Sequence, residues 1–120
     1  MTNAQALDFI RDYFDELFVK HNVDALDVYL HPDYSDDDIG PGEADPIQNS
    51  KNFLRDWFEK EPTIRVAVKD AMVQDDVITA FLEWYRTEKG VRQTIQKGVA
   101  IFVVKDRQIL KRHTFIYFET

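Results

Sequence analysis

The second half of the chain reads as four consecutive β-strands with almost no room for a helix between them. Apolar residues alternate or run together over segments that short polar turns separate, at Asp75-Asp76, Lys89-Gly90 and Lys105-Asp106. Turns this short join neighbouring antiparallel strands. The sequence therefore predicts an antiparallel meander from Thr63 to Phe118.

The first half of the chain has the apolar spacing of helices. Apolar residues recur every three or four positions over residues 6–18, which predicts a first helix with Asn3 as its N-cap. A short second helix is expected to end at Pro32, and a third helix is expected to begin with Ser50 as its cap. Helices followed by a meander are typical of an α+β domain, in which the helices cover one face of the sheet.

The composition fits one globular domain over residues 1–120. Hydrophobic residues make up 44% of the chain and aromatic residues 13%, so the chain can form a hydrophobic core without disulfides or a structural metal. The chain has no cysteine, which excludes thiolate catalysis, cysteine-ligated zinc and disulfides. The absence of cysteine fits a reducing cytosol, and a cytoplasmic protein is the expectation.

The net charge of the chain and the length of its apolar segments indicate which kinds of partner it can bind. The net charge of −7 argues against nucleic acid and anionic membranes as partners, because phosphate binding needs a basic face. No apolar stretch approaches the roughly 20 residues that span a bilayer, and no signal peptide is visible at the N-terminus. His21, His31 and His113 lack metal-ligand spacing, and no phosphate-binding or dinucleotide motif occurs, so we predict no metal and no cofactor.

The strand from Val77 to Tyr85 is apolar on both faces. If Ile78 and Trp84 face the helices, then Val77, Phe81 and Tyr85 face outward. An open antiparallel sheet usually has one solvated face, so an apolar outer face indicates a homodimer that packs two sheets together. The alternative is that curvature of the sheet hides these residues within one chain.

Several strings of residues, in order, match those of a known fold. They are Asn22–Leu26, Tyr29–Tyr34, the acidic run that ends at Asp38, Pro62–Val66, Val73–Val77 and Gly98–Ile109. Together they resemble the nuclear-transport-factor-two-like cone superfamily, and within it the SnoaL-like polyketide cyclase and ketosteroid isomerase-related group. The resemblance covers nearly the whole chain. It implies three N-terminal helices packed on a curved, mostly antiparallel sheet of four to six strands, which forms a cone with a pocket.

The resemblance makes Asp38 a candidate general base. It lies where isomerase-like members carry the acid that moves a proton α to a carbonyl, and desolvation at an apolar pocket mouth would raise its pKa. Strand alternation places Tyr34 and Asp36 on the same side as Asp38, so these three are the candidate catalytic residues. The alternative is a solvated acidic turn or a cap of the following loop.

Three positions depart from the catalytic pattern of the group. Phe14 and Ala100 stand where isomerases carry the two donors of the oxyanion hole, and Tyr13 is expected to point about 100° away from Phe14 on a helix. Thr114 stands where hydrolase-like and cyclase-like members carry an acid. Without the two donors an enolate would lack its main electrostatic stabilisation, so steroid isomerisation is not expected.

The resemblance also indicates which residues line the pocket. The aromatic candidates are Tyr29, Phe53, Trp57, Trp84 and Phe102, and the polar candidates are Gln96, Arg112 and Thr114. For each aromatic residue the alternative is an ordinary core position, and for Arg112 it is an ion pair with a helix carboxylate. An arginine in a pocket binds carboxylate, phosphate or an enolate oxygen. The expected ligand is a small apolar or aromatic molecule.

Two functions remain open from the sequence. One is a cofactor-independent isomerase, cyclase or lyase that uses Asp38 for proton transfer. The other is a non-catalytic ligand-binding or dimerisation module of the same fold, since one fold hosts many functions.

Overall fold

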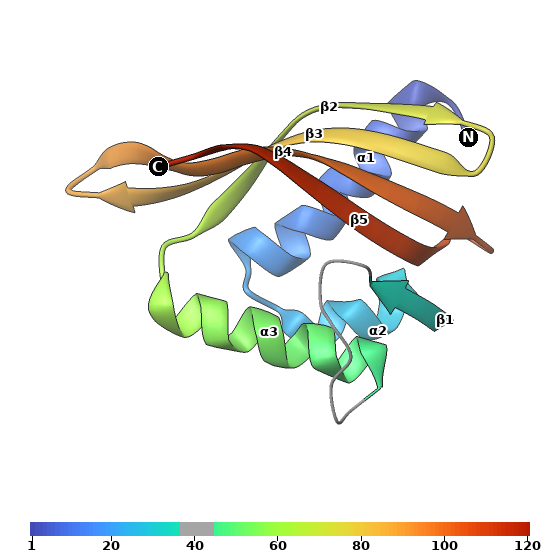
Figure 1. The fold of residues 1–120 in the computed structure, drawn as a ribbon, viewed down its shortest axis with the longest axis horizontal. Coiled ribbons are helices and arrows are strands. Elements are labelled where there is room, and N and C mark those ends of the chain that lie inside the picture. The colour runs from blue at the N-terminus through green and yellow to red at the C-terminus, as the bar shows by residue number, and fades with distance from the viewer. Residues whose placement is uncertain (37–44) are drawn as a thin grey trace.

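The computed structural model describes residues 1–36 and 45–120 and has a five-stranded sheet with the helices on one face (Figure 1). The predicted α+β fold class is confirmed. The elements are α1 (Asn3–Phe14), continued by a π-helical turn (Asp15–Val19), a 3-10 turn (Val23–Ala25), α2 (Leu26–Tyr29), β1 (Leu30–Asp36), α3 (Pro46–Lys60), β2 (Arg65–Gln74), β3 (Val77–Glu88), β4 (Val91–Lys105) and β5 (Gln108–Glu119).

The strand order in the sheet is β1-β5-β4-β3-β2. Strands β2 to β5 form the predicted antiparallel meander, in which each strand pairs with the next. Strand β1 joins the edge of the sheet parallel to β5 and sets Asp36 beside Arg112. The sequence indicated an extended segment here but not its partner, and this pairing brings a carboxylate to an arginine that is 76 residues away in the chain.

The N-terminus of α1 differs from its prediction. Thr2 is the N-cap: its side chain accepts from the Gln5 backbone N–H at 3.1 Å, and the Gln5 side chain accepts from the Thr2 N–H at 2.8 Å. This capping box satisfies two helix-end donors at once, which a single asparagine cap cannot do. Asn3 instead accepts a hydrogen bond from the Val73 backbone at 3.0 Å, which ties α1 to β2.

Two other helix boundaries also differ from prediction. Helix α3 begins at Pro46 with Asp45 as its N-cap, and Ser50 is buried within the helix. In an Asp-Pro pair the aspartate supplies the capping oxygen, and the proline has a φ that already suits the first helical position. The helix therefore starts before Ser50. Helix α2 ends at Tyr29, and Pro32 lies within β1, where an edge strand tolerates proline.

The side chains of β3 lie on the two faces of the sheet as the alternation in the sequence predicted. Ile78, Ala80, Leu82 and Trp84 face the helices and are buried, together with Ala100 and Phe102 of β4. The outer face carries Val77, Phe81, Val99, Ile101 and Phe115. Among these, Val99 of β4 pairs with Phe81 of β3 and with Phe115 of β5. Val77 and Phe115 are 37% and 51% exposed. His113 stacks on Phe115 at 4.3 Å between ring centroids.

Aromatic side chains join α1 to the sheet. Phe14 packs edge-on against Phe102, with ring centroids 6.2 Å apart, and Phe18 meets Trp57 of α3 at 5.6 Å. These contacts fix α1 and α3 relative to the inner face. Within the described residues, none of the helices is both long enough and apolar enough to cross a membrane.

Candidate functional site

A pocket lies between α3 and the helix-covered face of the sheet. Its volume is about 460 Å³. The lining residues are Phe53, Trp57, Trp84, Ile95, Gln96, Arg112, Thr114 and Ile116. Six of the eight predicted ligand-binding residues are therefore brought together around one cavity, although they come from four different elements. Their role in binding stays a prediction.

Helix α3 and strand β3 supply the aromatic walls. Phe53 and Trp57 are four positions apart and share one helix face, with ring centroids 5.9 Å apart. Phe53 is 50% exposed at the rim, whereas Trp84 is only 1% exposed at the base. Trp84 packs close to β4 because Gly98 has no side chain: a Cβ there would lie 3.3 Å from the Trp84 ring and 2.8 Å from the Phe115 carbonyl oxygen. Gly98 adjoins a register shift between β4 and β5, consistent with a bulge.

Two predicted wall residues lie elsewhere. Phe102 is fully buried and packs edge-on against Tyr13, with ring centroids 6.1 Å apart, so it belongs to the core. Tyr29 packs against Phe9 at 5.8 Å and Tyr13 at 5.5 Å, and it borders a smaller hollow beside α2. For Phe102 the core alternative describes the observed packing, because α1 covers it. Tyr29 is only partly buried and packs against α1.

A polar network lies behind the pocket wall. Arg112 donates from Nε to the Thr114 hydroxyl at 3.2 Å and also hydrogen-bonds the hydroxyl of Tyr13. On β1, the Tyr34 hydroxyl donates to the Asp36 carboxylate at 2.6 Å. The parallel pairing of β1 with β5 sets Asp36 beside Arg112. The network therefore links α1, β1 and β5 and holds the arginine at the pocket.

The two phenols of the network are neutral at physiological pH. Burial raises the pKa of Tyr13 to about 12, and the Asp36 carboxylate adds to this effect while Arg112 opposes it. The pKa of Tyr34 is raised as well, first by burial and then by Tyr13 and Asp36. Both hydroxyls therefore keep their protons and act as hydrogen-bonding groups, and Arg112 carries the positive charge.

Tyr13 is the functional candidate that sequence reasoning missed. Its expected direction, about 100° from Phe14, placed it away from the pocket. In the structure both residues are buried, because α1 is enclosed on more than one side. The available signal was chemical, since a tyrosine within a broad apolar stripe needs a hydrogen-bond partner for its hydroxyl.

The predicted catalytic residues divide into two groups. Tyr34 and Asp36 lie in β1 and belong to the network around Arg112. Asp38 lies outside the residues that the structure describes, and its role as a base remains a prediction.

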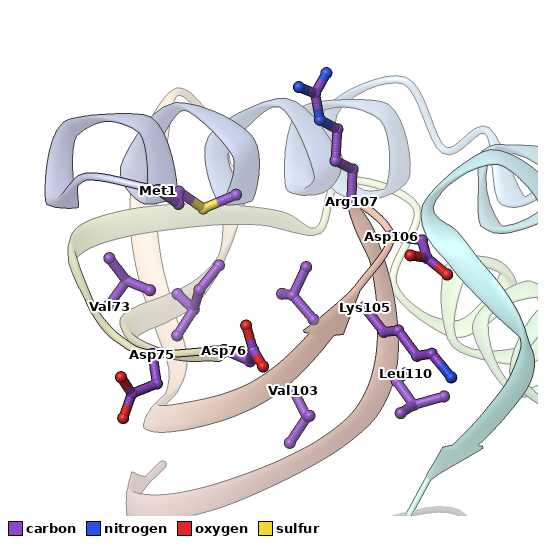
Figure 2. Close-up of a pocket in the computed structure, with 11 residues that line it drawn as sticks. Met1, Val73, Asp75, Asp76, Val103, Lys105, Asp106, Arg107 and Leu110 are labelled. Carbon is purple, nitrogen blue, oxygen red and sulfur yellow. The ribbon is translucent and has the colours of Figure 1, made fainter.

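A second, larger cleft of about 530 Å³ lies near the β2–β3 and β4–β5 turns (Figure 2). Apolar residues such as Val73 and Leu110 form part of its lining, and charged turn residues form the rest. Figure 2 shows the side chains of Asp75 and Arg107 extending in different directions instead of converging. A binding site needs a few convergent polar groups, so the pocket with Arg112 is the better candidate despite its smaller volume.

Comparison with models of protein families shows to which family the chain belongs. A family model described as a SnoaL-like domain matches residues 10–112. The chain belongs to the SnoaL-like family. The resemblance that the sequence strings predicted is thereby confirmed, and membership supports a small-molecule-binding function of the cyclase or isomerase kind. Comparison of this SnoaL-like protein with curated protein sequences gave no match.

Solved structures share the fold of this SnoaL-like protein. TsrD from Streptomyces laurentii superposes with a TM-score of 0.78 at 16% identity, over 98% of this chain and 91% of that chain. Wild-type IdmH from Streptomyces antibioticus gives 0.75 at 15% identity, over 94% and 92% of the two chains. A SnoaL-like polyketide cyclase from Agrobacterium tumefaciens gives 0.72 at 13% identity, over 92% and 90%. At these identities the likeness concerns the fold alone.

Proposed function

We propose that this SnoaL-like protein binds a small, largely apolar or aromatic molecule in the pocket under α3 and acts on it as a cofactor-independent cyclase or isomerase. One observation carries the proposal: aromatic walls and a network-held arginine meet in a single cavity of about 460 Å³. This volume lies within the range of about 300–1,000 Å³ that is typical of small-molecule sites. The polyketide cyclase of the same fold from Agrobacterium tumefaciens supports this class of ligand.

Arg112 is the group that supports proton-transfer chemistry. When a base removes a proton α to a carbonyl, negative charge develops on the carbonyl oxygen, and a pre-positioned cation stabilises it. Hydrogen bonds to Thr114 and Tyr13 hold the guanidinium, so little reorganisation is needed during the reaction. In this proposal Arg112 provides the stabilisation that Phe14 and Ala100 cannot.

Asp38 is the proposed base, with Asp36 and Tyr34 as its neighbours in the chain. A pocket base has a raised pKa, so ionising it costs stability, and this penalty grows above the unfolded pKa of about 3.9. Asp38→Asn should then stabilise the protein at pH 7 and abolish activity. If Asp38 instead caps the loop, the same substitution should destabilise the protein by about 1 kcal/mol. Denaturation curves of the two proteins distinguish these outcomes.

A non-catalytic binding module is the second candidate. Phe14, Ala100 and Thr114 each lack the polar or acidic group of catalytic relatives, and this favours binding without chemistry. A destabilised Asp38→Asn variant that binds ligand normally would support the module and overturn the role of Asp38 as a base.

Binding itself can be tested through the intrinsic fluorescence of the protein. The chain has two tryptophans, Trp57 and Trp84, and both line the pocket. Small aromatic ligands should quench or shift their emission and raise the thermal midpoint, because ligand binding stabilises the folded state. A panel of such ligands that changes neither signal at millimolar concentration would contradict the proposal.

We also propose that the outer sheet face joins two copies of the chain. Phe81, Val99 and Phe115 pair with one another across β3, β4 and β5 there, and Ile101 lies on the same face. Packing against a second sheet would remove this surface from water, and a two-fold dimer is the simplest such arrangement.

A further inference from the structure

The two edges of the sheet are protected to different degrees. On β2, side chains take the place of a neighbouring strand, and α1 packs across them. Asn3 accepts a hydrogen bond from the Val73 backbone N–H at 3.0 Å. Arg11 donates to the Val68 carbonyl oxygen at 3.3 Å. At the other edge, β1 pairs with β5 only as far as Arg112, and an uncovered edge presents backbone groups with which another strand can pair.

The end of β5, Phe115–Glu119, is the exposed part of this second edge. Among the described residues, β4 is the only strand that pairs with it, and Figure 1 shows β1 beside the start of β5, away from the C-terminus. Its apolar side chains are all exposed: Phe115, Ile116, Tyr117 and Phe118 are 51%, 37%, 66% and 44% exposed. The segment has no proline or lysine, which commonly block an edge, and its aromatic and β-branched residues favour a strand.

The outer-face contact proposed above does not account for this exposure. A second sheet packed on that face would cover the side chains of Phe115 and Phe118. Ile116 lies on the opposite face, where it lines the pocket, and Tyr117 has no partner in β4 because the register shifts there. A sheet packed on a face also forms no hydrogen bonds with the backbone of an edge. A strand added at the edge of β5 is therefore a separate contact.

The segment is matched to a second copy of itself in the antiparallel direction. Phe115 and Phe118 share the outer face, because the bulge at Tyr117 reverses the alternation of side chains. Thr114 and Glu119 share the pocket face for the same reason. In an antiparallel pair with its two-fold axis at the bulge, Phe115 of each copy lies opposite Phe118 of the other. Thr114 of each copy then lies opposite Glu119, so the side chains match on both faces.

Charge also favours a second copy in this direction. Glu119 is the only charged residue of the segment Phe115–Glu119. Antiparallel pairing sets its carboxylate opposite the neutral side chain of Thr114. A parallel pairing in register would instead set two Glu119 carboxylates side by side, which is unfavourable, whereas opposed aromatic residues such as Phe115 and Phe118 stabilise a strand pair.

We propose that Phe115–Glu119 pairs with the same segment of a second copy of the chain and extends the sheet across a two-fold axis. The segment is short, and interfaces well below about 1,200 Å² form transient complexes, so the contact is weak. We expect a dissociation constant on the order of 0.1–1 mM. In this pair Glu119 of the second copy lies beside Thr114 on the pocket face, so the second copy contributes a residue to the edge of the pocket.

Sedimentation equilibrium of Phe81→Glu tests the proposal, because this variant lacks the outer-face contact. At about 0.5 mM, near the expected dissociation constant, we expect a substantial fraction of dimer. Adding Tyr117→Lys should weaken association at least about tenfold, because it places lysines beside the two-fold axis. Val91→Lys, at a position of β4 that is 60% exposed, is the matched control and should leave association unchanged.

Two results of this experiment would overturn the proposal. One is a dimer of Phe81→Glu that Tyr117→Lys does not weaken. The other is a Phe81→Glu protein that stays monomeric at this concentration, which would exclude a second copy as the occupant of the edge in favour of a strand from another protein.

A cross-link tests the geometry without relying on the folding of Phe81→Glu. The chain has no cysteine, so Ile116→Cys provides a single thiol close to the proposed axis. Opposed side chains of antiparallel strands have Cβ atoms about 4.5–5.5 Å apart, near the separation that a disulfide spans. Mild oxidation should therefore link Ile116→Cys at least about tenfold faster than Val91→Cys. Packing of two outer faces cannot produce this link, because Ile116 lies on the pocket side of the sheet. Equal rates would overturn the proposal.

Discussion

The two faces of β3 are both apolar, yet the chain buries only one of them. Ile78 and Trp84 on the inner face are at most 1% exposed, because α1 and α3 cover them. Val77 on the outer face is 37% exposed, and Phe81 beside it is half-buried. The comparison teaches that alternate residues of one strand serve different purposes: the inner set builds the core and the pocket, and the outer set forms a surface available for another molecule.

The outer face also contains a buried charge. Glu83 is 8% exposed and is contacted by Lys69 and Arg92, each at 3.1 Å, and by the Thr94 hydroxyl. The Arg92 guanidinium in turn lies 3.7 Å from the Tyr85 ring centroid. The outer face is thus divided into an apolar part and a charge cluster.

The largest expected effect is on the inner face. Trp84→Ala should lower the free energy of unfolding by about 3–5 kcal/mol, because it leaves a large cavity in the core. Trp57→Ala should cost clearly less, because Trp57 is only partly buried at the pocket wall. Urea denaturation of both variants measures the difference. A near-zero cost at Trp84 would refute the assignment of that residue to the core.

Phe81→Glu tests the outer face in the same strand. If the face joins two copies, a charge buried against an apolar partner should weaken dimerisation about a hundredfold or more. Sedimentation velocity at micromolar concentration should then show dimers for the parent protein and monomers for the variant. Gln93→Glu, at an exposed position of β4, is the control. A parent protein that sediments only as a monomer would count against the dimer.

Gly98→Ala tests how closely the inner face is packed. An added methyl group would lie 2.8 Å from the Phe115 carbonyl oxygen and 2.9 Å from the Ile116 side chain, and the backbone atom cannot move without disturbing β5. We expect a loss of about 2 kcal/mol, typical of overpacking. Thermal and urea unfolding report the loss. Gly90→Ala is an unsuitable control because Gly90 has a positive φ. The better comparison is Ala100→Gly, which removes a methyl group from the neighbouring inner position.

The smallest effect concerns the charge cluster of the outer face. The hydrogen bond from Thr94, followed by Lys69 and Arg92, lowers the pKa of Glu83 against the opposing effect of burial. A lowered folded-state pKa contributes stability above the unfolded value of about 4.3, and this contribution is lost as the pH falls through the folded value. Glu83→Gln should therefore cost about 1 kcal/mol at pH 7 and less in acid. A cost independent of pH would contradict this account.

The local patterns of the sequence were sufficient for much of this structure. Alternation along Val77–Tyr85 predicted which side chains face the helices, and short polar turns predicted the meander, because both depend on neighbours within one strand or hairpin. Six pocket residues, among them Trp57 and Arg112, were also predicted, through the resemblance to a family whose strings match in order. The caps at Asn3 and Ser50 were wrong because other nearby residues compete for the same helix ends.

Only the tertiary structure decided the contents of the site. The parallel pairing of β1 with β5 sets Asp36 beside Arg112, and no local pattern encodes a pairing between segments so far apart. Helical spacing placed both Tyr13 and Phe14 in an apolar stripe, and both are buried, but it did not predict that the Tyr13 hydroxyl would meet Arg112 of β5. The place of Phe102 was decided in the same way: an apolar side chain fits a pocket wall and a core equally well, and the packing of α1 against the sheet puts Phe102 in the core.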